Sequence, residues 1–347
     1  DKLLEKVKGQ TAVVQEVKRT KKSTPPPMLY DLTELQRDAN RLYQMSPKQT
    51  LNVMQSLYER YKALTYPRTD SRYLTADIVP TLTERVQVVA RGEYAPLARE
   101  ILREKRSIAK ACINDAKVSD HHAIIPTEAP VGLESMNNEE KRIYWLVVRR
   151  FLACFFPHYE YESLKLTLTC QGERFTAAGR TELHAGWKRV EQLRDEEEQE
   201  EQSLPPVEKG QSFPLRNFQR KALKTQPPAR YTEATLLSAM ENPSAYITDK
   251  RMKEYIGGGL GTPATRADIT EKLFSSFYME KRGNSLVPTS KGTQLISLAP
   301  EQLREPLLTA QWEQRLEAIS KGQDTRGKFI GEIREYASQL VEDVKNS

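Results

Sequence analysis

The chain has 347 residues, of which 38% are hydrophobic, and its formal net charge is +6. This length allows two or three domains with their own cores, and the positive charge favours a polyanionic partner. No stretch approaches eighteen consecutive apolar residues, so we predict no membrane span. Cys112, Cys154 and Cys170 are far apart and form no Cys-x-x-Cys pair. This argues against a zinc site or a disulfide framework and fits a reducing, cytoplasmic setting.

The first predicted element is a strand at 11–22 that ends in a basic stretch, followed by the stiff connector Pro25-Pro26-Pro27. At 160–190 apolar and polar residues alternate on both sides of a turn at 171–173, which predicts a β-hairpin in an antiparallel sheet. The strand at 11–18 has no local partner. We therefore expect it to pair with this hairpin, which makes 29–157 a helical insertion in a β-domain.

Helices dominate the insertion. Asp31 or Thr33 can cap a helix over 32–43, and Ser46-Pro47 is a typical cap followed by an N1 proline. Further helices are expected at 75–91, 94–105 and 138–156. Residues at helical spacing that should face a core are Leu51, Met54, Leu57, Tyr58 and Tyr61 in one helix, and Ile143, Leu146, Val147, Phe151, Cys154 and Phe155 in another.

After 194–211, which we interpret as a solvated acidic connection, helices return. They are expected at 232–241, 249–255, 264–274, 300–321 and 325–345, with a short hairpin at 278–287. Helices followed by a hairpin with basic Lys281 and Arg282 resemble a winged-helix arrangement, a common nucleic-acid binder. Six acids crowd the run at 195–201, and such a charge run is usually solvated rather than a metal site.

The most informative stretch is LTYPRTDSRYL at 64–74. Pro67 pushes Tyr66 into an extended conformation, so the tyrosine should leave its helix and present its hydroxyl. Arg68 offers a fork of donors suited to a phosphodiester, and Thr69 and Asp70 can orient their neighbours. Tyrosine is a covalent nucleophile that needs cationic help. For the Tyr-Pro dipeptide alone, the purely structural alternative is a turn with solvated charges beside it.

The whole string resembles the active-site signature of type IA DNA topoisomerases, and most closely the topoisomerase III branch. Four more segments match the same family in order: PPMLYDLTELQ at 26–36, SDHHAIIPT at 119–127, YTEA at 231–234 with GLGTPATR at 259–266, and PTSKG at 288–292 with TAQWE at 309–313. Together these matches cover 25–322, and the chain is identified as a member on that basis.

The resemblance implies an α+β, multidomain fold with the toroid core of type IA topoisomerases. We expect an antiparallel β-arch or hinge domain at 1–28 plus 158–226. An inserted helical, winged-helix-like domain at 29–157 would carry the tyrosine, and a mainly helical domain at 227–347 would guide single-stranded DNA. The chain starts with Asp1 rather than Met. We interpret it as a fragment that lacks an N-terminal Toprim domain.

The resemblance also implies the chemistry. Tyr66 would form a 5′-phosphotyrosine, another strand would pass through the gap, and religation would follow without ATP. Arg68 and His121 would be catalytic with Tyr66. The expected DNA-binding residues are Thr69, Asp70, Arg72, His122, Thr262, Thr265 and Arg266. Mg²⁺ would be held by the Toprim domain, so we expect no metal ligands here. The expected partner is single-stranded DNA, with no membrane, and the protein should be a monomer.

Two of the motifs also have purely structural interpretations. His121 and His122 could simply pack at an element edge, and two adjacent histidines make a poor metal site. The resemblance places His121 beside the tyrosine on a DNA phosphate and leaves the role of His122 open. The glycines at 257–261 lack the Gly-Lys-Ser/Thr of a nucleotide loop. They could instead lead to a helix whose amides at Ala264 and Thr265 hold a phosphate, or to a plain helix cap.

The sequence leaves two other functions to consider. A non-catalytic module that binds single-stranded DNA is the first alternative. A tyrosine recombinase or type IB topoisomerase is the second, but those enzymes place the tyrosine near the C-terminus, after their arginines. Tyr66 comes early in this chain, which argues against the second alternative.

Overall fold

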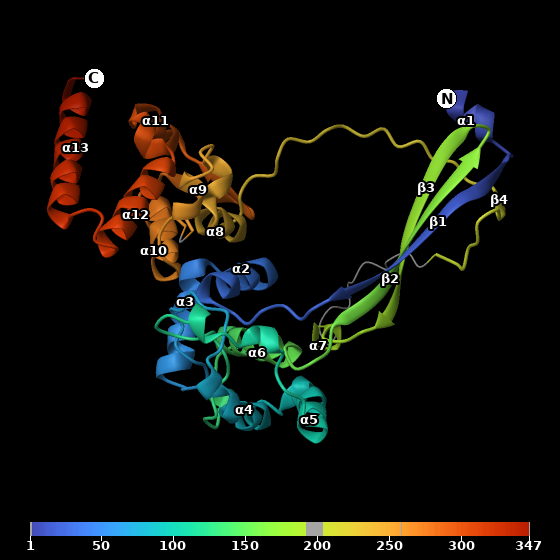
Figure 1. Ribbon diagram of the computed structural model, residues 1–347, viewed down its shortest axis with the longest axis horizontal. Helices are drawn as coiled ribbons and strands as arrows, with labels where there is room; N and C mark the ends of the chain where they lie inside the picture. Colours follow the sequence, from blue (N-terminus) through green and yellow to red (C-terminus); the bar gives the residue numbers. More distant parts are fainter. Residues whose placement is uncertain (1, 192–203, 258, 347) are drawn as a thin grey trace.

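The computed structural model describes residues 2–191, 204–257 and 259–346. Figure 1 shows a long sheet arm that projects from a body of helices, with the N-terminus at the tip of the arm and the C-terminus at the opposite end of the molecule. The predicted α+β, multidomain class is confirmed. The acidic run at 195–201 lies outside the described residues. None of the described helices is long and apolar enough to cross a bilayer.

The arm is a four-stranded antiparallel sheet in the order β3-β2-β1-β4. Its strands are β1 (Thr11–Thr24), β2 (Tyr159–Cys170), β3 (Glu173–His184) and β4 (Ser212–Pro214), and α1 (Lys2–Val7) precedes them. Gln171 and Gly172 have φ values of 50° and 78°, the left-handed pair that a two-residue hairpin turn needs. Val14 of β1 lies opposite Leu168 of β2. The hairpin and its pairing with the first strand are confirmed, whereas α1 and β4 were not predicted.

Helices inserted between β1 and β2 form the central body. They are α2 (Leu32–Tyr43), α3 (Pro47–Glu59), α4 (Leu82–Val88), α5 (Ala95–Glu104) and α6 (Asn138–Ala153), and the short α7 (Lys188–Glu191) follows β3. The carboxylate of Asp31 accepts the amide of Glu34 at 2.7 Å, and the hydroxyl of Ser46 accepts the amide of Gln49 at 3.1 Å. Both predicted helix starts are therefore correct, with Asp31 rather than Thr33 as the cap.

One predicted helix is broken. Over 75–91 the chain forms a 3₁₀ turn at Ala76–Thr81 and only then α4. Pro80 lies inside this stretch, and proline has no amide donor and clashes with the preceding turn of an α-helix. The body has one hydrophobic core, whose buried members come from Leu29 to Val190 in the sequence and include Trp187. Residues after the hairpin thus pack with the helices, although the domain division proposed from the sequence assigns them to the arm.

A buried ionic cluster fixes α2 against α6. The hydroxyl of Tyr30 donates to Asp38 at 2.5 Å, and the guanidinium of Arg150 donates to the same carboxylate at 2.7 Å and covers the Tyr30 ring at 4.1 Å. Burial acts to raise the pKa of Asp38, but the Tyr30 hydrogen bond and the charge of Arg150 outweigh it and lower that pKa. The ionised form of Asp38 is therefore favoured in the folded chain.

Asp38→Asn should lower the free energy of unfolding by about 3 kcal/mol at pH 7, because it leaves the largely buried guanidinium of Arg150 without its carboxylate partner. Because the pKa of Asp38 is lower in the folded chain than in the unfolded chain, ionised Asp38 stabilises the fold at any pH above the ordinary pKa of an aspartate. This stabilisation is lost as the pH falls through the folded value. Urea unfolding of both proteins at pH 7 and near pH 3 measures the difference, which should shrink in acid.

Asp268→Asn is the matched control, because Asp268 forms an exposed ion pair with Lys48 and such pairs contribute less than about 1 kcal/mol. A difference between wild type and Asp38→Asn that stays constant down to pH 3 would contradict the assigned charge of Asp38.

The C-terminal unit contains α8 (Glu233–Glu241), α9 (Met252–Tyr255), α10 (Pro263–Ser275), α11 (Ser290–Leu298), α12 (Leu307–Ser320) and α13 (Arg326–Asn346), with the hairpin of β5 (Met279–Arg282) and β6 (Ser285–Pro288). The order of helices and hairpin agrees with the sequence prediction. The predicted helix at 249–255 is a single turn, and α11 was not predicted. Ile247, Ile256 and Ala310 form a separate small core in this unit.

The seam between α2–α3 and the C-terminal unit is polar. Arg37 pairs with Glu241 at 3.3 Å, and Lys48 pairs with Asp268 at 2.6 Å. Asn40 donates to Glu233 at 3.2 Å. None of the hydrophobic clusters formed by the described residues contains members from both sides. Polar contacts of this kind are typical of interfaces between domains, which supports the proposed division of the chain near residue 227.

Candidate active site

Tyr66 is presented by a short extended segment that follows α3. The amide of Thr65 donates to the carbonyl of Ile125 at 3.0 Å, and the amide of Thr127 donates to the carbonyl of Ala63 at 3.0 Å. These two bonds hold 63–65 beside 125–127. The chain then reaches Tyr66 and the buried Pro67, outside any helix.

Two aromatic rings flank Tyr66. The His121 ring lies over it with the ring centroids 4.1 Å apart and the planes inclined by 34°. Tyr58 forms a T-shaped contact with it, with the centroids 5.5 Å apart and the planes at 86°. Tyr66 is half-buried, whereas His121 is exposed. Residues far apart in the sequence thus form one packed group around the Tyr66 ring.

Thr69 fastens the tyrosine segment to its surroundings. Its hydroxyl donates to the carbonyl of His121 at 2.8 Å and accepts the amide of Ser71 at 3.0 Å. Its carbonyl accepts the amide of Leu32 at 3.1 Å. The side chain is buried. Thr69 was predicted to bind DNA, and the structure shows its hydroxyl engaged within the protein instead.

Arg72 lies in a cluster of carboxylates. Its Nε donates to Asp31 at 2.5 Å, and its Nη2 lies 3.4 Å from both Glu34 and Glu241. Burial acts to lower the pKa of Arg72, but the charge of Asp31 outweighs it and raises that pKa. Arg72 was predicted to contact DNA. In this structure it instead ties the end of the tyrosine segment to the cap of α2 and the end of α8.

A cleft of about 450 Å³ lies beside this segment. It is lined by Asp31, Arg68, Thr69, Asp70, Ser119, Asp120, His121, Glu241, Gly257, Thr262, Pro263, Ala264 and Arg266. We call it the active-site cleft. Arg68 and Asp70 are exposed, and Arg68 has no ion-pair partner among the described residues, so its guanidinium is available to a ligand.

The far wall of the cleft is the start of α10. Gly259 has a φ of +78°, and a Cβ there would lie 2.4 Å from the carbonyl oxygen of Met240, so glycine permits this close approach. The amide of Thr262 donates to the hydroxyl of Thr265 at 2.9 Å, which caps the helix. Both threonines are exposed. The helix N-terminus therefore faces the cleft with a favourable dipole for an anion.

Arg266 and His122, both predicted to bind DNA, make contacts within the protein. Arg266 is buried and donates to the carbonyl of Leu260 at 3.2 Å and to the hydroxyl of Thr33 at 3.0 Å. His122 is half-buried, and its Nδ1 donates to the carbonyl of Ala123 at 2.7 Å. Burial lowers the pKa of His122, which favours the neutral ring. His122 is not among the residues that line the cleft, and its contact with DNA stays a prediction.

Glu241 was not predicted to belong to the site. It lines the cleft and pairs with Arg37 and Arg72. Burial, and then the nearby carboxylate of Asp31, raise the pKa of Glu241 despite these arginines. No local pattern marks it, because it is the last residue of an ordinary helix. Asp31 did carry a signal as a helix cap inside one of the matched motifs.

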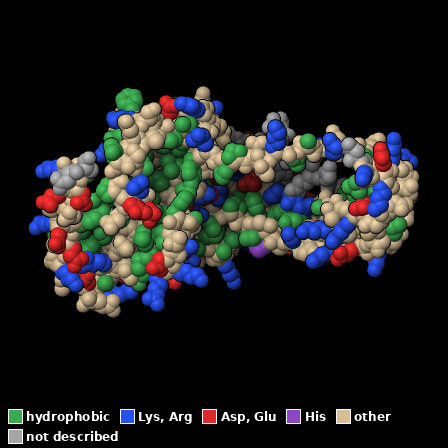
Figure 2. Space-filling model, turned by 90° about the horizontal axis from the view of Figure 1, so that it is seen from above, with side chains coloured by type: hydrophobic (Ala, Val, Ile, Leu, Met, Phe, Trp, Pro, Cys, Tyr) green, Lys and Arg blue, Asp and Glu red, His purple; other side chains and the backbone are tan. Residues whose placement is uncertain are grey.

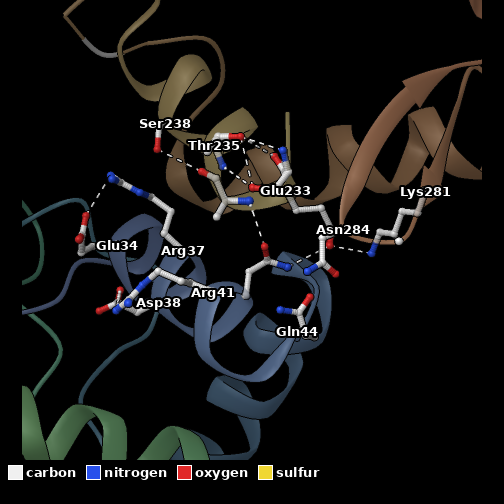
Figure 3. A pocket seen from close by; sticks show the side chains of 14 residues that line it. Glu34, Arg37, Asp38, Arg41, Gln44, Glu233, Thr235, Ser238, Lys281 and Asn284 are labelled. Carbon is white, nitrogen blue, oxygen red and sulfur yellow. Dashed lines mark hydrogen bonds and ion pairs between the residues drawn. The ribbon is translucent and has the colours of Figure 1, made fainter. Parts of the chain in front are cut away.

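A second cavity, of about 550 Å³, lies where α2, α8 and the β5–β6 turn meet (Figure 3). We call it the α2–α8 pocket. Lys281 donates to Glu233 at 2.6 Å, Arg41 pairs with Asp38 at 3.2 Å and Arg37 pairs with Glu34 at 3.0 Å. The charged groups drawn in Figure 3 thus pair with one another, as in the rest of the seam.

A magnesium ion has no evident ligands in the described part of the chain. No group of three or more histidine, cysteine, aspartate or glutamate side chains there could hold a metal ion. Asp31 and Glu241 are paired with arginines instead. The described residues do not fit a metal site.

Comparison with known proteins identifies the family. The model of the DNA topoisomerase family matches residues 1–331. The chain belongs to the DNA topoisomerase family. DNA topoisomerase 3 of Bacillus cereus is 48% identical over 100% of this chain and 49% of the relative, and the Bacillus subtilis protein of that name gives the same figures. The family indicated by the motifs is therefore confirmed. This topoisomerase chain spans about half the length of these relatives.

A solved structure agrees with the fold. Full-length topoisomerase I from Thermotoga maritima superposes with a TM-score of 0.74 and 24% identity, over 98% of this chain and 54% of that protein. At this identity the likeness shows the fold alone. The arm and helical body of the topoisomerase chain are thus arranged as in a known family member.

Proposed function

We propose that this chain is the tyrosine-bearing part of a topoisomerase that cleaves single-stranded DNA, passes another strand through the gap and rejoins the ends. The observation that carries the proposal is the packing of Tyr66 against His121, because His121 lines the cleft together with Arg68 and the start of α10. Membership of the DNA topoisomerase family supports DNA as the partner. Because the chain spans half of its relatives, the activity is proposed for the longer protein.

The proposed reaction is a reversible transesterification. The Tyr66 oxygen attacks phosphorus and forms a new phosphoester bond, while the bond to the ribose 3′ oxygen breaks. The phenol loses a proton and the ribose oxygen gains one. Attack by the 3′-hydroxyl on the 5′-phosphotyrosine reverses each change. Since the bond energy is kept in the phosphotyrosine, the cycle needs no ATP.

Arg68 would supply positive charge to the phosphate in a cleft that the carboxylates of Asp31, Asp70, Asp120 and Glu241 also line. Arg68 is unpaired among the described residues, and its fork of donors suits two phosphate oxygens of the transition state. His121 borders the same space. The amides at the start of α10, with Thr262 and Thr265, would hold a neighbouring phosphate. Thr69, Arg72 and Arg266 would hold the protein parts of the site in place.

The metal is assigned to the rest of the protein. Mg²⁺ bound by a Toprim domain would polarise the scissile phosphate, which agrees with the lack of a group of metal ligands among the described residues. Lys18, Arg19, Lys21 and Lys22 are exposed on β1, and Lys and Arg side chains are spread along the arm in Figure 2. This charge suits a polyanion. We propose a monomer that acts in the cytoplasm.

The 347-residue chain on its own should bind a single-stranded oligonucleotide without relaxing a supercoiled plasmid in Mg²⁺. Raising the salt from about 50 to 200 mM should weaken binding about 50-fold if four phosphates are neutralised. Filter binding on single-stranded and duplex forms of one sequence measures this, and the duplex should bind less well. Efficient relaxation by this chain alone would contradict the assignment of the metal to another domain.

A non-catalytic module that binds single-stranded DNA is the alternative. It predicts the same salt dependence but no covalent adduct, even in the protein extended to the length of its relatives. Denaturing electrophoresis after incubation with a labelled oligonucleotide and Mg²⁺ separates the two functions.

A further inference from the structure

The orientation of the Tyr66 ring depends on packing alone. Among the described residues neither the Tyr66 hydroxyl nor the Tyr58 hydroxyl makes a hydrogen bond. The ring contacts of Tyr66 are the tilted stacking with His121 at 4.1 Å and the T-shaped contact with Tyr58 at 5.5 Å. Since the ring torsion of tyrosine is broad, removal of either neighbour gives the ring more freedom.

Tyr58 is itself held firmly. It lies in the last turn of α3, and its ring has the ammonium group of Lys62 5.7 Å from its centroid. The next turn of chain is fixed by the amide of Ala63, which donates to the carbonyl of Leu57 at 2.9 Å, and by the hydroxyl of Thr127, which donates to the carbonyl of Lys62 at 2.5 Å. The backbone that carries Tyr58 is therefore fixed beside Tyr66, whereas His121 is exposed and lines the cleft.

We propose that Tyr58 is a positioning residue for Tyr66, an inference that rests on the proposed function of Tyr66 as nucleophile. The Tyr58 ring packs against the Tyr66 ring in a T-shaped contact and would keep the Tyr66 oxygen directed at the phosphate. Edge-to-face contacts are a favoured geometry of aromatic pairs. The ring, and not the hydroxyl, performs this role. A misplacement of about 1 Å at a reacting group costs about 10²-fold in rate.

The test compares Tyr58→Leu with Tyr58→Phe in the protein extended to the length of its relatives. Single-turnover formation of the covalent adduct is measured over a series of single-stranded oligonucleotide concentrations. Tyr58→Leu should lower the maximal rate about 10- to 100-fold while the half-saturating concentration stays within about threefold. Tyr58→Phe should stay within about twofold of wild type, because it keeps the ring.

Tyr61→Leu is the matched control. Tyr61 follows the same helix, and its hydroxyl donates to the carbonyl of Ser135 at 2.8 Å and to Glu140 at 3.1 Å. The Tyr61→Leu substitution removes an aromatic ring of the same size that packs against the core of the helical body, and no ring contact joins Tyr61 to Tyr66. The control should lower the melting temperature but leave the adduct-forming rate within about threefold. A Tyr58→Leu rate equal to wild type, a Tyr58→Phe rate as low as that of Tyr58→Leu, or an equal loss in Tyr61→Leu would overturn the proposal.

A measurement without activity separates this proposal from the proposed function. The ring resonance of Tyr66 in the ¹³C-tyrosine-labelled 347-residue chain is assigned by its loss in Tyr66→Phe. It should shift in Tyr58→Leu and stay in place in Tyr61→Leu. If wild type forms no adduct, the nucleophile assignment fails, whereas an unmoved resonance in Tyr58→Leu shows that Tyr58 does not position the ring.

Discussion

Tyr66→Phe is expected to abolish covalent attachment to DNA in the protein extended to the length of its relatives, while its affinity for a single-stranded oligonucleotide stays within about threefold. Only the oxygen that would form the phosphoester is lost. The ring contacts with His121 and Tyr58 involve atoms that phenylalanine keeps. Arg68 and the start of α10 also remain, so the phosphate contacts that dominate affinity are retained.

The measurement is the amount of labelled oligonucleotide that stays with the protein after denaturation. Tyr73→Phe is the control, because Tyr73 belongs to the same segment but its hydroxyl accepts a bond from Lys117 at 3.1 Å. It should form adduct as wild type does. An adduct trapped in Tyr66→Phe would show that the nucleophile is another residue.

Arg68→Ala is expected to slow cleavage by about 10²- to 10³-fold, the usual loss when one donor to a transition state is removed. The guanidinium lines the active-site cleft, is exposed and has no ion-pair partner among the described residues, so it is free to meet a phosphate. Arg68→Lys should restore only part of the rate, because an ammonium group is a point charge and cannot reproduce the planar fork.

Single-turnover cleavage of a labelled oligonucleotide gives these rates. Arg103→Ala is the control, since Arg103 is highly exposed and pairs only with its neighbour Glu104 among the described residues, well away from the cleft. Its rate should be unchanged. Equal rates for Arg68→Lys and wild type would remove bidentate recognition from the mechanism.

Local signals in the sequence were enough for most of the secondary structure. The cap at Asp31, the Ser46-Pro47 start and the Gln171-Gly172 turn each act within about four residues, so their chemistry can be recognised along the chain. The same holds for the Tyr66 string, whose proline and neighbouring arginine define an extended, basic segment. Its resemblance to a family, together with four other motifs in order, indicated the family that the comparisons confirm.

The secondary structure was predicted wrongly where two local signals in the sequence compete. The apolar spacing over 75–91 predicted one helix, but Pro80 imposes a 3₁₀ turn before α4 begins. Tyr58 was predicted only to face the core. Helical spacing specifies the side of the helix that is buried, and it does not specify which residue of another segment lies there.

The sequence by itself determined the family, the pairing of the first strand with the hairpin, and the residues expected to carry the chemistry. Only the tertiary structure decided what each of them contacts. Arg72 pairs with Asp31 and Glu241, and the buried Arg266 donates to Thr33. Those partners lie 41, 169 and 233 residues away in the chain. A buried charge must find compensating groups, and the partner it finds depends on which helices the fold brings together.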